Sequence, residues 1–77
     1  MEKKLYRTLS SREIHIGLEV IYHPIIQSDN ILRNTKILSE VMLLGKDSVV
    51  QVKDELGCVF LESIELKSEY SRRKTNL

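Results

Sequence analysis

Residues 14–22 read Ile14-His15-Ile16-Gly17-Leu18-Glu19-Val20-Ile21-Tyr22 and carry the strongest strand signal in the chain. They are rich in β-branched and aromatic residues, which suit a pleated, half-buried surface. Their alternation places one apolar set on a single face, namely Ile14, Ile16, Leu18, Val20 and Tyr22. Pro24, the only proline, lacks a backbone N–H and is expected to end this strand.

Residues 45–61 predict a second strand unit. Gly-Lys-Asp-Ser over residues 45–48 is typical of a turn, and the valine-rich residues 48–53 follow as a short strand. Residues 54–57 form another turn that ends in a glycine, and Cys-Val-Phe-Leu over residues 58–61 gives the next strand. Two short strands joined by a four-residue turn indicate a β-hairpin.

The segment between these units fits two structures. As a strand, residues 36–44 present one apolar face interrupted by a serine: Ile37, Ser39, Val41 and Leu43. As a helix over about 29–44, the segment has an apolar stripe formed by Ile31, Leu32, Leu38, Val41 and Met42. Gly45 then occupies the position of a C-cap glycine. The strand is preferred because Asn34, Thr35, Ile37 and Val41 are mediocre helix formers.

Length and charge define the expected organisation. A chain of 77 residues forms one domain at most. Residues 14–66 hold four basic against eight acidic side chains, whereas residues 1–13 and 67–77 are net basic. We therefore expect an acidic folded domain over 14–66, an N-terminal extension over 1–13 and a basic C-terminal tail over 67–77.

Several classes of protein do not fit the composition. No apolar run approaches the roughly 18 residues of a membrane span, so we expect no membrane association. The first residues have no apolar stretch typical of a secretory signal. One cysteine cannot hold a small secreted scaffold together, which favours a reducing, cytoplasmic setting.

The sequence predicts no catalytic residue, metal ligand or cofactor. His15, His23 and Cys58 lack the local spacing of a zinc site. Cys58 lies in an apolar strand-like run, where a cysteine is usually a small buried hydrophobe and not a nucleophile. The pair Gly45-Lys46 departs from a phosphate-binding loop because Glu40 and Asp47 stand where that motif has a glycine and a hydroxyl residue. We therefore predict that the protein is not an enzyme.

Residues 17–66 resemble small SH3-like barrels, including KOW-type domains and the accessory barrels of phages and mobile elements. The resemblance rests on Gly17-Leu18-Glu19-Val20-Ile21-Tyr22, on the hairpin at 47–61 and on Ser63-Ile64-Glu65-Leu66. It implies an all-β fold, a five-stranded barrel with flexible basic termini, whose closure hides its strand edges. The alternative is an α+β fold with a helix at about 29–44 packed on a hairpin. The resemblance also implies a binding module without catalysis.

The main functional expectation is a small interaction module, an accessory or regulatory protein of a phage or mobile element that binds a host protein. Four acidic residues are the expected contacts: Glu40, Asp47, Asp54 and Glu55. The alternative is a nucleic-acid-binding regulator that uses Lys36, Lys46, Lys53, Arg72, Arg73 and Lys74. Tyr22 and Phe60 are assigned to core faces, which leaves few aromatics for base stacking. A homodimer through an uncovered strand edge, or through residues 25–32, stays open.

Overall fold

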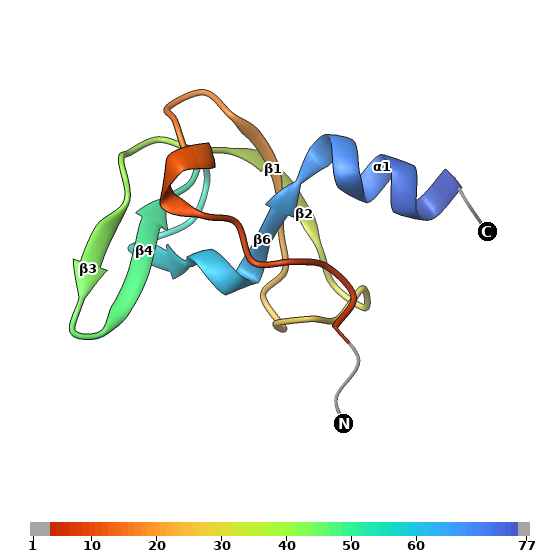
Figure 1. Cartoon of the computed structure of the whole chain (residues 1–77), viewed down its shortest axis with the longest axis horizontal. Helices are drawn as coiled ribbons and strands as arrows, with labels where there is room; N and C mark the ends of the chain where they lie inside the picture. Colours follow the sequence, from red (N-terminus) through yellow and green to blue (C-terminus); the bar gives the residue numbers. More distant parts are fainter. Residues whose placement is uncertain (1–3, 76–77) are drawn as a thin grey trace.

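The computed structural model describes residues 4–75, which form an α+β fold (Figure 1). Six strands and one α-helix make up its regular structure, together with two short 3-10 helices. In chain order the elements are η1 (Ser11–Glu13), β1 (Glu19–Tyr22), β2 (Arg33–Lys36), β3 (Met42–Leu44), β4 (Asp47–Gln51), β5 (Cys58–Phe60), η2 (Leu61–Ser63), β6 (Ile64–Leu66) and α1 (Lys67–Thr75).

The first sheet has the strand order β2-β1-β6, and both pairings are antiparallel. Its central strand β1 ends at Tyr22, before Pro24 as predicted, but it begins at Glu19 and not at Ile14. The backbone turns first, because Leu18 N–H donates to His15 O at 3.1 Å and Gly17 has a φ of +93°. Ile16, predicted on the apolar face, is therefore 64% exposed.

The second sheet has the order β3-β4-β5 and contains the predicted hairpin of β4 and β5, which is confirmed. A two-residue turn joins β3 to β4, with Leu44 opposite Asp47. Gly45 occupies the first turn position with a φ of +65°, which suits glycine in a type II′ hairpin turn.

An isolated antiparallel bridge between Ile37 and Val52 connects the two sheets. Next to it, Leu38 N–H donates to Gln51 O at 2.8 Å and Lys53 N–H donates to Lys36 O at 3.0 Å. Apolar side chains from both sheets and from the N-terminal segment form one buried cluster: Leu9, Val20, Ile37, Val50, Val52, Val59, Leu61 and Ile64.

Both predicted architectures are wrong. The two sheets do not close into a barrel, so the five-stranded all-β barrel is overturned. The alternative helix at about 29–44 is also absent, because β2 and β3 lie there, and the α-helix is α1 in the predicted tail. This helix is strongly polar and has no buried residue, so its sequence lacks the apolar periodicity that would predict a helix.

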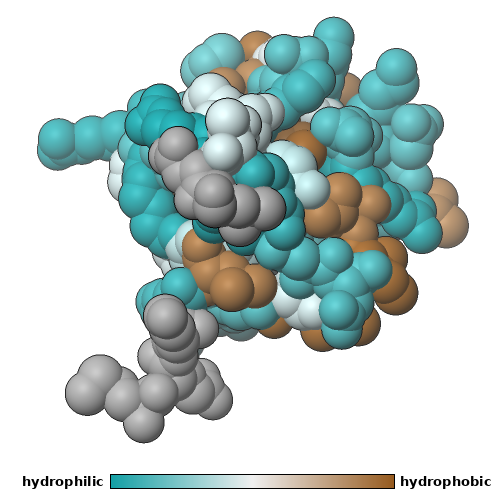
Figure 2. Space-filling model, turned by 90° about the vertical axis from the view of Figure 1, so that its right-hand side faces the viewer, coloured by the Kyte–Doolittle hydropathy of each residue, from teal (hydrophilic) through white to brown (hydrophobic). Residues whose placement is uncertain are grey.

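The described parts of the two terminal segments pack onto the sheets, contrary to the prediction of flexible termini. Tyr6 and Leu9 are buried, and α1 contacts β1 and β6. Residues 1–3 and 76–77 of the predicted extension and tail lie outside the described residues. Figure 2 shows the side of the molecule that carries α1, where the surface is mainly hydrophilic with separate hydrophobic patches. Between residues 4 and 75, no helix has the length and apolar character needed to cross a bilayer.

Candidate functional site

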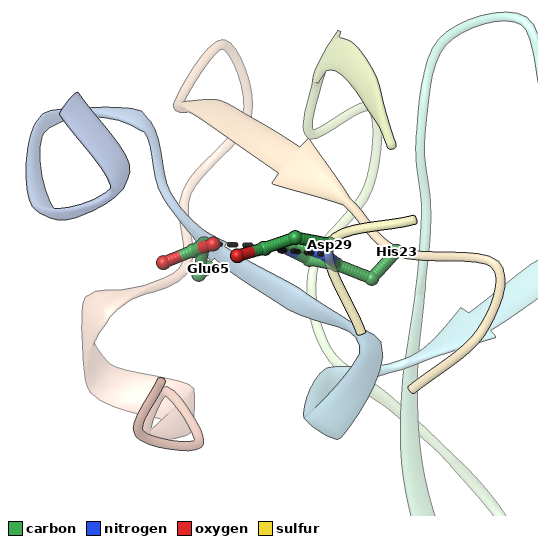
Figure 3. Close-up of side chains that lie close together, drawn as sticks. All are labelled: His23, Asp29 and Glu65. Carbon is green, nitrogen blue, oxygen red and sulfur yellow. Dashed lines mark hydrogen bonds and ion pairs between the residues drawn. The ribbon is translucent and has the colours of Figure 1, made fainter. Parts of the chain in front are cut away.

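A buried polar cluster joins the end of β1, the loop after it, β6 and α1. His23 follows β1 directly and is fully buried, and Glu65 of β6 is 1% exposed. Nε2 of His23 lies 2.7 Å from Oε1 of Glu65 (Figure 3). Nδ1 of His23 lies 2.8 Å from the carbonyl oxygen of Ser28. A carbonyl oxygen only accepts, so Nδ1 carries a hydrogen.

Helix α1 supplies the cations that face this cluster. The Arg73 guanidinium donates to Glu65 Oε1 at 2.6 Å and to both carboxylate oxygens of Asp29, at 2.7 and 3.1 Å. Lys74 Nζ donates to Asp29 Oδ2 at 2.9 Å. These hydrogen bonds, those from Arg73 above all, hold the pKa of the Asp29 carboxyl well below its usual range. The cluster thus fastens α1 to the first sheet.

Tyr6 attaches the N-terminal segment to the same cluster. Its ring stacks on the His23 ring with a centroid separation of 4.5 Å. Its hydroxyl donates to Glu62 O at 3.0 Å and accepts from Gln27 N–H at 3.1 Å. Burial raises the pKa of the Tyr6 hydroxyl above its ordinary value.

The cluster includes three potential metal ligands that the sequence analysis did not combine. Ligand atoms of His23, Asp29 and Glu65 all lie within 4.8 Å of one another. However, Arg73 and Lys74 already balance the two carboxylates, and a dication at this point would face both of them. The full burial of His23 also gives a substrate no access to its ring. The arrangement therefore acts as a structural anchor.

The four predicted acidic contacts do not share one surface. Asp47 begins β4, whereas Asp54 and Glu55 lie in the turn after its other end, and Glu40 precedes β3. Glu55 is half-buried and pairs with Arg33 at 2.9 Å. Only Glu40 and Asp47 flank the same strand, β3.

The predicted nucleic-acid contacts are also separated. Lys36 and Lys53 line one hollow of about 160 Å³, which they share with Lys67. Lys46 lies in the β3–β4 turn, away from that hollow. In α1, Arg73 and Lys74 are engaged by Asp29, while Arg72 is exposed.

The β3-β4-β5 sheet exposes an apolar surface that the sequence analysis missed. Val50 and Val59 pair with each other and belong to the core, so by alternation Val49 and Phe60 lie on the opposite side. Met42 pairs with Val49 and therefore shares that side. We call this the outer face, and its apolar residues are Met42, Leu44, Val49 and Phe60.

Three of these residues are exposed to solvent. Met42 is 39%, Leu44 63% and Phe60 40% exposed, while Val49 lies between Met42 and Phe60 in the strand register and is buried. Phe60 and Cys58 were predicted to be buried, yet Cys58 is also exposed. Figure 1 shows β3 at the end of the molecule farthest from α1.

Comparison of the chain with protein-family models, with curated proteins and with solved structures finds no match.

Proposed function

We propose that the chain is a non-enzymatic protein-binding module that binds its partner on the outer face of the β3-β4-β5 sheet. The observation that carries the proposal is the exposure of Met42, Leu44 and Phe60 together on that face. A monomeric protein rarely exposes a contiguous apolar surface without a use for it, and such surfaces mark interaction sites.

The composition of the outer face suits the centre of an interface. Aromatic residues and methionine are enriched at such centres, and a few buried anchors supply most of the binding energy. Phe60 is the largest side chain of the face and lies on β5, whereas Leu44 lies on β3. We therefore assign the anchor role to Phe60 and the second contact to Leu44.

Charge gives the partner its chemistry. Glu40 precedes β3, and Asp47 is paired with Leu44, so two exposed carboxylates border the outer face. They favour a partner with an apolar centre and a basic rim, because complementary charges at a rim speed association and exclude wrong partners. Asp54 and Glu55 lie at the opposite end of β4 and have no part in this contact.

The test is quantitative affinity purification from the cells that encode the protein, with mass spectrometry of the bound proteins. Leu44→Ser and Phe60→Ser are each expected to reduce recovery of the main partner at least about tenfold, as loss of an interface anchor does. Leu56→Ser is the matched control, because Leu56 is 102% exposed in the β4–β5 turn, outside the outer face.

A charge-reversal pair tests the rim. Asp47→Lys is expected to lower recovery of the same partner, whereas Asp54→Lys leaves it unchanged. If wild type, Phe60→Ser and Leu56→Ser all recovered the same amount of the main partner, the result would contradict the proposal.

One feature favours the nucleic-acid alternative: three lysines, at 36, 53 and 67, line a single hollow, which Glu19 and Asp54 line as well. This alternative predicts a salt-dependent gel shift that is lost in Lys36→Glu/Lys53→Glu. Absence of any shift at about 50 mM salt would exclude it.

A further inference from the structure

We infer that β3 pairs antiparallel with the β3 strand of a second copy of the chain, which joins two β3-β4-β5 sheets into one. In this sheet β3 is an edge strand, with β4 as its only neighbour among the described residues. The inference goes beyond the proposed function, because it concerns the edge of the sheet and not its outer face.

Apart from its short length, the edge of β3 lacks the features that usually prevent such pairing. Natural edge strands are protected by very short length, lysines, prolines, bulges or covering segments. Strand β3 consists of Met42, Leu43 and Leu44, all exposed, and Leu43 is 76% exposed. Although β3 has only three residues, its uncovered apolar edge offers unpaired backbone groups to another strand.

The backbone of Leu43 has the direction that pairing requires. Leu44 and Asp47 close a two-residue hairpin turn, and such a closing pair exchanges hydrogen bonds across the hairpin. In an antiparallel ladder the next residue directs its N–H and C=O the other way, so those of Leu43 point to the free edge. If Leu43 lies opposite Leu43 of the partner subunit, the two residues would therefore exchange two backbone N–H···O=C hydrogen bonds.

The charges around β3 are complementary to those of a second copy in this register. Antiparallel pairing centred on Leu43 places Met42 opposite Leu44 of the partner subunit. Beyond Leu44 the chain turns at Gly45 and Lys46, so Glu40 of one copy lies alongside the turn that carries Lys46 of the partner subunit, twice per dimer by symmetry. Both side chains are exposed. Opposite charges across neighbouring strands stabilise pairing, and a parallel arrangement would instead place like charges opposite each other.

The test is sedimentation equilibrium of the full chain over a range of concentrations. A short edge buries less surface than a standard interface, so we expect a reversible monomer–dimer equilibrium with a dissociation constant below about 1 mM. Glu40→Lys and Lys46→Glu each bring like charges near each other twice, and each is expected to weaken the dimer about tenfold. The control Lys53→Glu, beyond the far end of β4, leaves the dimer unchanged.

Mixing the two charge variants gives the decisive result. A Glu40→Lys chain and a Lys46→Glu chain carry complementary charges in the antiparallel register, so the mixture is expected to dimerise at least as well as wild type. A wild-type chain that stays monomeric at about 1 mM, or a mixture that associates no better than either variant alone, overturns the inference. Phe60→Ser separates the two proposals, because it removes partner binding and leaves edge pairing intact.

Discussion

Removing the Arg73 side chain tests the buried anchor between α1 and the first sheet. In Arg73→Met, Glu65 loses its donor at 2.6 Å and Asp29 loses donors at 2.7 and 3.1 Å. The methionine keeps much of the side-chain volume, so the change acts mainly through charge. Glu65 is the sensitive partner, because it is 1% exposed and its Oε2 atom already has no hydrogen-bond partner among the described residues.

The magnitude follows from burial. Removing one partner of a buried ion pair costs about 3–5 kcal/mol, because the remaining charge is uncompensated. Glu65 keeps its contact with His23 at 2.7 Å, and solvent reaches the Arg73 and Asp29 side chains, which are 24% and 23% exposed, so the lower end, about 3 kcal/mol, applies. A domain this small has a stability of about 3–5 kcal/mol from its core, so Arg73→Met should be close to unfolding.

The assay is urea denaturation followed by far-UV circular dichroism. Arg72→Met is the matched control, since it removes the same charge from an exposed neighbour in α1, and it should change stability by less than about 0.5 kcal/mol. Glu65→Gln/Arg73→Met should recover at least half of the loss, because the buried carboxylate is no longer present. Equal effects of Arg73→Met and Arg72→Met would refute this reasoning.

Three further changes test other parts of the fold. Arg73 above all lowers the pKa of the Asp29 carboxyl. The ionised carboxylate therefore contributes its full stabilisation above the unfolded-state pKa of about 4, and this stabilisation is lost as pH falls below that value. Asp29→Asn should flatten the loss of stability in an acid titration. Tyr6→Phe leaves the Gln27 N–H without its hydroxyl acceptor and should cost about 1 kcal/mol in urea denaturation. Gly45→Ala should destabilise by about 1 kcal/mol in the same assay, because φ at this turn is +65°, and an increase in stability would count against the turn assignment.

The sequence was informative where structure depends on local patterns. The valines of β4 and the turn before Cys58 predicted the β4–β5 hairpin, and Pro24 marked the limit of β1 correctly. Strand alternation identifies two faces but does not say which of them meets the core. Phe60 was assigned to the core for this reason, although Val59 points there.

The polar anchor and α1 could not be predicted, because they depend on contacts between distant residues. Glu65 meets His23 across 42 positions and Arg73 meets Asp29 across 44. One local signal was present: Glu65 lies between Ile64 and Leu66, and a charged residue in an apolar strand suggests a buried partner. The separation of Asp47 from Asp54 and Glu55 by the length of β4 likewise depends on the fold and is not visible in the sequence.

The most direct test of the account is amide chemical-shift mapping of the isotope-labelled chain with the partner recovered by purification. Binding on the outer face predicts that the largest shifts occur at Met42, Leu44, Val49 and Phe60, with little change in α1. Shifts concentrated on Arg72, Lys74 and the lysines at 36 and 53, with the outer face unchanged, would contradict it.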